Sequence, residues 1–147
     1  MSSSLHLEFT DAPPADDLDI VDAGLHQFNL QAADLAAVQP RACFARDAGG
    51  RVIGGVRARQ WGAAVEVQQL WVDTAWRRQG VGARLMRLLE DEVCRRGAAL
   101  VYLDTFSFQA RGFYERCGYA VAARLDGFPD GIEKYLMTKR LGAAAPG

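Results

Sequence analysis

The sequence predicts an α+β fold, a sheet with helices on both of its faces. Three observations support this prediction. Three strand-like segments follow one another between residues 41 and 73, two later segments show helical periodicity, and an apolar run at 98–106 lies between those helices. The chain has 147 residues, of which 50% are hydrophobic, which suits one domain with a single core. We expect residues 1–147 to form that domain, with residues 1–4 and 142–147 as frayed tails.

The first forty residues predict a strand followed by a helix. The segment "LHLEFT" (5–10) alternates apolar and polar residues, as a half-buried strand does. Thr10 or Asp11 can cap a helix that begins around Pro13 and Pro14, because proline is tolerated in a first helical turn. The apolar residues of this helix recur at three- and four-residue steps and predict one apolar face: Leu18, Val21, Leu25 and Phe28.

The next three segments predict an antiparallel meander. "RACFARD" and "RVIGGVRARQW" flank the turn "AGG", and a second turn precedes "AAVEVQQLWVD". In this third strand Val65 and Val67 are apolar at odd positions, whereas Leu70 and Val72 are apolar at even positions. A β-bulge at residues 68–69 explains this change of parity. A strand buried on both faces near its end is the alternative.

The remaining segments predict helices and strands in alternation. A helix follows residue 80 and ends at Gly97. "AALVYLDTF" (98–106) is almost continuously apolar and predicts a central buried strand. "FQARGFYERCG" (108–118) predicts a short amphipathic helix, and "YAVAARL" and "EKYLMTKRL" predict two strands joined by the turn-rich "DGFPDG". The helix after residue 80 has an apolar face made of Val81, Leu85, Leu88, Leu89 and Val93.

The composition argues against several classes of protein. Seventeen basic and eighteen acidic side chains give a net charge of -1, which predicts no nucleic-acid partner and no polybasic membrane patch. No apolar run approaches the roughly 20 residues that a membrane-spanning helix needs, and the first residues lack the features of a secretory signal. The three cysteines lie in different segments without metal-ligand spacing, so we expect reduced thiols, no metal site and a cytoplasmic protein.

The stretch "WRRQGVG" (76–82) is the strongest local signal of function. A strand that runs through glycines into a helix exposes free N–H groups at the positive end of the helix dipole. Gly80 and Gly82 let a phosphate approach the backbone, and Arg77 and Arg78 add cations suited to phosphate oxygens. The stretch therefore predicts a pyrophosphate site. Glycines that only serve a tight turn, beside solvated arginines, are the alternative.

Two motifs resemble those of the GNAT family of N-acetyltransferases. Arg77-x-x-Gly80-x-Gly82 matches the pyrophosphate loop of the family, and "FQARGFYERCGY" resembles its second signature, a short helix with A-x-x-x-Y ahead of a G-[FY] pair. The resemblance covers residues 43–139, and residues 5–40 match in element order only. It implies the GNAT fold, a mixed, mostly antiparallel sheet of six to seven strands with a V-shaped splay between the fourth and fifth strands.

The resemblance also implies that acetyl-CoA is the donor, bound without a metal in that splay. Backbone groups around residues 70–72 would bind the pantetheine arm, and the N–H groups of residues 78–83 would bind the pyrophosphate. Ser107 stands where the family often carries asparagine; it can still hydrogen-bond, over a shorter reach. The residues expected to bind acetyl-CoA are Leu70, Trp71, Val72, Arg77, Arg78, Gln79, Gly80, Val81, Gly82, Ala83, Thr105, Ser107, Ala110, Phe113 and Tyr114.

Acetyl transfer to an amine needs a base, a donor for the oxyanion and an acid for the departing thiolate. Tyr114 matches the acid position of the family; a core aromatic beside Phe113 is the alternative. Glu66 is the candidate base, because it lies fourteen residues before Gly80, as in family members that use a strand glutamate. A solvated strand glutamate is the alternative. A backbone N–H near residues 70–72 would bind the oxyanion.

The predicted function is therefore transfer of an acetyl group from acetyl-CoA to a primary amine of a small molecule, by direct attack. A protein lysine or N-terminus as acceptor, a non-catalytic acyl-CoA-binding module and a homodimer remain open. The family builds its acceptor pocket from the first helix, the segment after it and the last hairpin, where carboxylates among aromatic side chains suit a cationic amine. Here those side chains are Asp22, Asp34, Asp126, Asp130, Glu133, Phe28, Phe128 and Tyr135.

Overall fold

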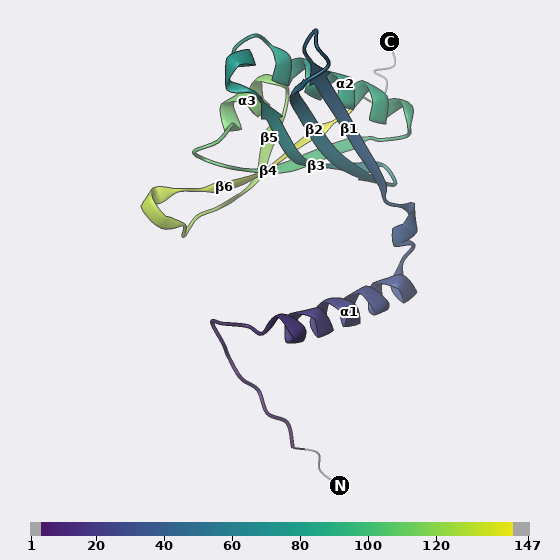
Figure 1. The fold of residues 1–147 in the computed structure, drawn as a ribbon, viewed down its shortest axis with the longest axis vertical. Helices are drawn as coiled ribbons and strands as arrows, with labels where there is room; N and C mark the ends of the chain where they lie inside the picture. Colours follow the sequence, from purple (N-terminus) through teal and green to yellow (C-terminus); the bar gives the residue numbers. More distant parts are fainter. Residues whose placement is uncertain (1–3, 143–147) are drawn as a thin grey trace. The chain divides into compact units, whose positions relative to one another are not determined.

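The computed structural model describes residues 4–142. The chain divides into two compact units, and the boundary between them along the sequence lies between residues 36 and 37. The elements of the fold are shown in Figure 1. The helices are α1 (Ala15–Ala32), α2 (Val81–Arg95) and α3 (Arg111–Arg116), with 3₁₀ turns at Leu35–Ala37, Thr74–Trp76 and Pro129–Gly131. The strands are β1 (Gln39–Arg46), β2 (Val52–Trp61), β3 (Ala64–Val72), β4 (Leu100–Phe106), β5 (Ala120–Leu125) and β6 (Lys134–Arg140).

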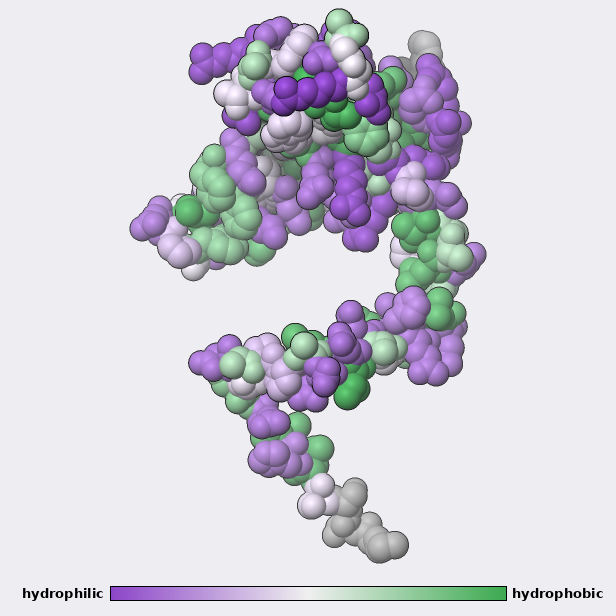
Figure 2. Space-filling view, in the orientation of Figure 1, coloured by the Kyte–Doolittle hydropathy of each residue, from purple (hydrophilic) through white to green (hydrophobic). Residues whose placement is uncertain are grey.

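The first unit contains α1, and its predicted strand is wrong. Residues 5–10 form no strand and are exposed, because alternation alone does not satisfy backbone N–H and C=O groups that have no neighbouring strand. Pro14 is the N-cap of α1, and the predicted cap Thr10 instead accepts a hydrogen bond from the N–H of Ala12 at 3.1 Å. Apolar side chains lie exposed among hydrophilic ones along α1 (Figure 2).

The second unit is a mixed, mostly antiparallel sheet of six strands in the order β1-β2-β3-β4-β6-β5. The parallel pair is β3–β4; the other neighbours are antiparallel. The prediction of six to seven strands is confirmed at six, since the segment expected to form a seventh is not a strand. The expected tails lie mostly in residues 1–3 and 143–147, outside the described residues.

The predicted bulge in the third strand of the meander is confirmed. Ala58 pairs with Val67 and the preceding Arg57 pairs with Gln69, so Gln68 has no partner on β2. One extra residue shifts the pleat by one position. Residues 65 and 67 therefore face the core before the bulge, and Leu70 packs against the same core after it.

A single hydrophobic core lies between the sheet and the helices α2 and α3. Both helices contribute to it on the same face of the sheet, and a helix on the opposite face stays a prediction. The predicted apolar face of α2 is correct at Leu85, Leu89 and Val93, but Leu88 is 47% exposed. The largest fully buried side chains are Met86, Leu89, Leu103, Met137, Val56, Val65, Val93 and Val101.

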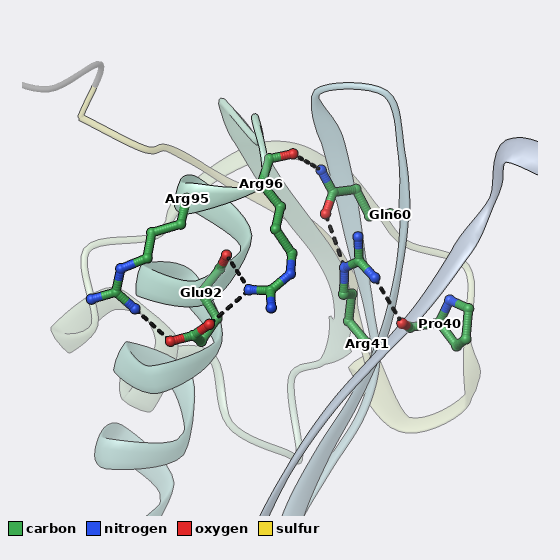
Figure 3. Close-up of polar contacts among 6 residues, drawn as sticks. All are labelled: Pro40, Arg41, Gln60, Glu92, Arg95 and Arg96. Carbon is green, nitrogen blue, oxygen red and sulfur yellow. Dashed lines mark hydrogen bonds and ion pairs between the residues drawn. The ribbon is translucent and has the colours of Figure 1, made fainter.

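Polar contacts fasten the C-terminal end of α2 to the first strands (Figure 3). Gln60 is only 4% exposed. Its side chain accepts a hydrogen bond from Arg41 Nε at 3.1 Å and donates one to the carbonyl of Arg96 at 3.0 Å. Glu92 forms an ion pair with Arg96 at 2.7 Å. These contacts satisfy a helix end that would otherwise leave carbonyl groups without partners. No helix within residues 4–142 is long and apolar enough to cross a membrane.

The core predicts a large difference between two neighbouring leucines of α2. Leu89 is 1% exposed and Leu88 is 47% exposed. Leu89→Ala should lower the free energy of unfolding by about 2–5 kcal/mol, because it leaves a cavity. Leu88→Ala should change it by about 0.5 kcal/mol. Urea unfolding of both variants checks this, and equal losses would contradict the register of α2.

Candidate active site

The sheet opens between its two parallel strands. The ladder between β3 and β4 consists of the pairs Ala64–Leu100, Val65–Val101 and Glu66–Tyr102, and then it stops. Both strands continue past these pairs, and β3 remains paired with β2 on its other side. The edge of β3 that faces β4 therefore carries backbone N–H and C=O groups without a ladder partner, and such groups bind whatever polar group enters.

A cavity of about 250 Å³ occupies this opening. The bulge of β3 forms one wall and the end of β4 forms the other, and the start of α3 contributes Ala110 and Tyr114. The cavity joins three segments that are distant in the sequence. Its lining residues are Val67, Gln68, Gln69, Leu70, Leu103, Asp104, Thr105, Gln109, Ala110 and Tyr114.

The glycine-rich turn leads directly from β3 into α2. Gly80 is the N-cap of α2 with φ 77°, a left-handed conformation that favours glycine, and no atom lies within 4 Å of the place where its Cβ would be. The first hydrogen bond of the helix joins the N–H of Arg84 to the carbonyl of Gly80, at 3.0 Å. The preceding N–H groups, those of residues 81–83, are free of intrahelical acceptors and open to an anion.

Gly82 couples this turn to the helix α3. A Cβ at Gly82 would lie 3.2 Å from the ring of Phe113, so the glycine lets the two elements pack closely. Arg77 Nε donates a hydrogen bond to the carbonyl of Val72 at 3.0 Å, and Gln79 Nε2 donates one to the carbonyl of Ala75 at 3.2 Å. The side chain of Arg77 therefore also fastens the turn to the end of β3.

Tyr114 is the buried phenol of the cavity. Its side chain is 8% exposed and lies edge-on to Phe113, with ring centroids 5.2 Å apart. Burial raises the pKa of Tyr114 from its ordinary value near 10 to about 12. The hydroxyl therefore stays protonated at neutral pH, as an acid that gives up a proton must be.

The end of β4 and the segment after it place Thr105 at the cavity and Ser107 away from it. Thr105 is buried, and its Oγ1 accepts a hydrogen bond from the N–H of Ala110 at 3.4 Å. The Oγ of Ser107 accepts a hydrogen bond from the N–H of Glu133 at 3.0 Å, so this hydroxyl holds the last strand, and Ser107 does not line the cavity. Sequence reasoning missed Gln109, which lines the cavity; its place in the "FQARGFY" motif was the available signal.

Glu66 lies in the last pair of the β3–β4 ladder, where the strands begin to separate. Its neighbours Val65 and Val67 face the core, so its side chain lies on the opposite face of the sheet. Arg59 Nε donates to Glu66 Oε1 at 2.7 Å, and the Glu66 side chain is 26% exposed. One carboxylate oxygen is thus engaged by a guanidinium, and Glu66 does not line the cavity.

Three of the predicted acceptor residues of the last hairpin, Phe128, Glu133 and Tyr135, already have partners within the chain. Glu133 forms an ion pair with Arg124 at 3.0 Å and accepts a hydrogen bond from the hydroxyl of Tyr135 at 3.0 Å. Phe128 packs edge-on against Phe106, with ring centroids 5.4 Å apart. Within residues 4–142, no group of three or more His, Cys, Asp and Glu side chains is arranged to hold a metal ion.

The site combines a sheet opened between parallel strands, a glycine turn at a helix N-terminus that is open to an anion, and a buried, protonated tyrosine. The chain belongs to the acetyltransferase (GNAT) family, whose sequence profile matches residues 5–119. The family match confirms the resemblance of the two motifs, and the protein is an acyltransferase.

Named relatives are acetyltransferases. The chain is 35% identical over 114 residues to blasticidin-S acetyltransferase of Streptomyces morookaense, which covers 76% of this chain and 81% of that protein. A crystal structure of an acetyltransferase from Agrobacterium tumefaciens superimposes with a TM-score of 0.76 at 25% identity, covering 92% of this chain and 99% of that one. An aminoglycoside 6'-N-acetyltransferase complexed with coenzyme A superimposes with a TM-score of 0.62 at 25% identity, covering 70% and 73%.

The burial of Tyr114 predicts a late titration. Because its pKa is about 12 in the folded chain and near 10 in the unfolded chain, the unfolded chain releases the proton first as pH rises. Stability should therefore fall between about pH 10 and pH 12. The ultraviolet difference between the protein and Tyr114→Phe should show a phenolate step near pH 12. A step near pH 10, with the fold intact by circular dichroism, would show that the phenol is accessible to water.

Proposed function

We propose that the protein transfers the acetyl group of acetyl-CoA to a primary amine of a small molecule. The opened β3–β4 pair carries this proposal, because Tyr114 lines its cavity and the strand β3 that forms one wall leads on into the glycine turn. A binding module has no need of a buried, protonated phenol at the end of that cavity. The family assignment supports the enzymatic reaction over the binding module.

The residues present fit acetyl-CoA. The free N–H groups at the start of α2 and the open space beside Gly80 suit a pyrophosphate. The cavity of about 250 Å³ suits the narrow pantetheine arm, and the unpaired edge of β3 supplies hydrogen-bonding partners for its amides. A related structure contains coenzyme A. The donor's thioester would then lie near residues 70–72, between the bulge and Tyr114.

In the proposed reaction the amine attacks the thioester directly. A backbone N–H near residues 70–72 that points away from β2 binds the oxygen that becomes negative, since it is fixed in position before the reaction begins. Tyr114 gives its proton to the departing sulfur. Glu66, on the other face of the sheet, takes the proton of the amine, directly or through water, with its free carboxylate oxygen.

A small-molecule acceptor is supported by the relatives. Two of them are named for blasticidin-S and for aminoglycosides. In this chain, Glu133, just before β6, and Tyr135 of β6 would place a carboxylate and an aromatic ring beside a cationic acceptor. An N-terminal peptide or a lysine side chain is the competing acceptor, and it would need an open groove rather than a closed pocket.

The decisive experiment is release of coenzyme A from acetyl-CoA with a panel of amines. The panel contains blasticidin S, an aminoglycoside, a polyamine, a lysine peptide and a peptide with a free N-terminus. We expect turnover with one of the small molecules, and a mass increase of one acetyl group on that acceptor. Turnover with a peptide alone would replace the proposed acceptor class, and binding without any turnover would favour the acyl-CoA-binding module.

Gly82→Val should weaken acetyl-CoA binding by about tenfold or more, equivalent to about 1.4 kcal/mol. The added side chain meets the ring of Phe113, which lies 3.2 Å from the Cβ position, and so displaces the wall beside the helix N-terminus. Isothermal titration calorimetry measures the affinity. Gly49→Val, in the turn between β1 and β2, is the control, and an equal loss there would show a general effect on the fold.

Tyr114→Phe should lower kcat by about 10²-fold or more while acetyl-CoA affinity changes little, because only a hydroxyl is removed and a positioned acid contributes about 10²–10⁴-fold. Steady-state kinetics with a saturating amine checks this, and the melting temperature reports whether packing survives. A loss below about threefold would remove Tyr114 from the role of acid.

Glu66→Gln should depress kcat/KM at neutral pH and recover partly as pH rises. An alkyl ammonium with a reference pKa near 10.4 is mostly protonated at neutral pH, so a base is needed there and matters less once the amine is neutral. Glu92→Gln, on the outer side of α2, is the control. A uniform loss across pH would mean that Glu66 positions the substrate. An unchanged profile would transfer the role to water or to Glu133.

A further inference from the structure

A cluster of buried and partly buried polar side chains lies outside the proposed reaction site. Glu90 of α2 is 9% exposed, and both of its oxygens are engaged. Lys139 Nζ donates to Oε1 at 2.7 Å, and the hydroxyl of Tyr119 donates to Oε2 at 2.8 Å. The sequence pattern does not predict these contacts, because the partners of Glu90 lie 29 and 49 residues further along the chain. We call Glu90, Tyr119 and Lys139 the anchor cluster.

The anchor cluster grips the C-terminal end of α3. Lys139 Nζ also donates to the carbonyl of Cys117 at 2.8 Å, so one ammonium joins α2, β6 and the residue that ends α3. Gly118 lets it approach, since a Cβ there would lie 3.2 Å from Lys139 Cε. Burial and the neighbouring Glu90 raise the pKa of Tyr119, which keeps its hydroxyl a donor.

Tyr114 rests on the residues that the anchor cluster holds. The N–H groups of Cys117 and Tyr119 both bond the carbonyl of Tyr114 at 3.0 Å. The rings of Tyr114 and Tyr119 lie edge-to-face with centroids 5.9 Å apart. The helix α3 has six residues, fewer than an isolated helix needs for stability, so its position depends on such outside contacts.

Stability alone is a weak reason for this arrangement. Replacing a buried ion pair by apolar side chains of similar volume is often neutral or stabilising, because two charges lose their hydration. Directional bonds, by contrast, fix the position of a group more narrowly than apolar contacts do, and a displacement of about 1 Å near reacting atoms can cost about 10²-fold in rate.

We propose that Glu90, Tyr119 and Lys139 are positioning residues, which hold α3 so that the hydroxyl of Tyr114 faces the β3–β4 cavity. This inference rests on the proposed function, in which Tyr114 is the acid. Lys139 bonds the carbonyl of Cys117, and the ring of Tyr119 is fixed two residues later, so loss of these contacts lets the helix tilt without removing any atom from the cavity wall.

The test combines three variants, one of them double, with a direct probe of Tyr114. Tyr119→Phe removes one bond of the anchor cluster and leaves the ion pair. Glu90→Leu together with Lys139→Met removes the charges as a pair, which avoids an unpaired buried charge and so preserves folding. Gln60→Leu is the control, because it breaks a different buried polar contact of α2, the one between Gln60 and the carbonyl of Arg96. Fluorotyrosine placed at position 114 reports on that ring by fluorine NMR.

We expect the fluorine resonance of residue 114 to broaden or split in the two anchor variants and to stay single in Gln60→Leu, even where the melting temperature falls equally. We expect kcat to fall about fivefold or more, with the KM for acetyl-CoA nearly unchanged. In a Tyr114→Phe background the same changes should lower kcat by less than about twofold, because the group they position is gone.

Two results would overturn the proposal. One is an unchanged fluorine resonance in both anchor variants, which shows that Tyr114 does not depend on the cluster. The other is a loss of kcat that persists in full without the Tyr114 hydroxyl, which shows a general structural role. A changed resonance with unaltered turnover would support the mechanical coupling and remove the acid role of Tyr114, so a failure of the proposed function is distinguishable.

Discussion

One extra residue in β3 is the constraint on which the rest of the site depends. A strand that keeps its period of two would place Leu70 on the face away from the core. The unpaired Gln68 shifts the pleat, so Leu70 packs into the core while the β4-facing edge of the strand is left without a ladder beyond Glu66. The cavity therefore follows from the same bulge that lets Leu70 pack against the core. Hydrophobic burial of the end of β3 supplies the free energy that keeps polar backbone groups unpaired.

The elements around this opening are coupled by close contacts rather than by one large interface. Gly82 brings the N-terminus of α2 against Phe113 of α3, and Arg77 fastens the glycine turn to the end of β3. On the far side of α3, Lys139 holds its C-terminal carbonyl. A short helix held at both ends in this way behaves as part of the sheet, which suits a side chain whose direction matters more than its volume.

Local sequence patterns predicted the helices and strands on which the site is built. Contacts between residues far apart in the sequence were missed. The parity change in "VEVQQLWV" reported the bulge directly, because side-chain alternation is a property of the strand itself. The strand expected at residues 5–10 failed, since a strand exists only where a neighbour satisfies its backbone. The burial of Glu90 and the engagement of Ser107 with Glu133 both depend on residues far along the chain. The periodicity of one segment contains no information about such distant partners. The motif of α3 therefore pointed to Tyr114, but it did not predict the side chains that hold the helix in place.

The raised pKa of Tyr114 must be compatible with its proposed role of giving a proton to a thiolate, and burial in the same cavity makes it so. A phenol with a pKa of about 12 is a weaker acid than an ordinary thiol near 8.5, so in water it would not protonate a thiolate. Burial, however, disfavours every negative charge that forms in the same cavity, and a thiolate that departs into it is raised in basicity by the same desolvation that acts on the phenol. Proton transfer is decided by the difference in pKa between the phenol and the thiol when both lie in the same cavity.

In the proposed reaction Glu66 has the opposite requirement, because a base must be ionised to accept the amine proton. Its carboxylate lies on the face of the sheet away from the core, where Arg59 Nε donates to it at 2.7 Å. In the proposed reaction, a proton is thus given on the core side of the opened strands and taken on the opposite face, beside Arg59.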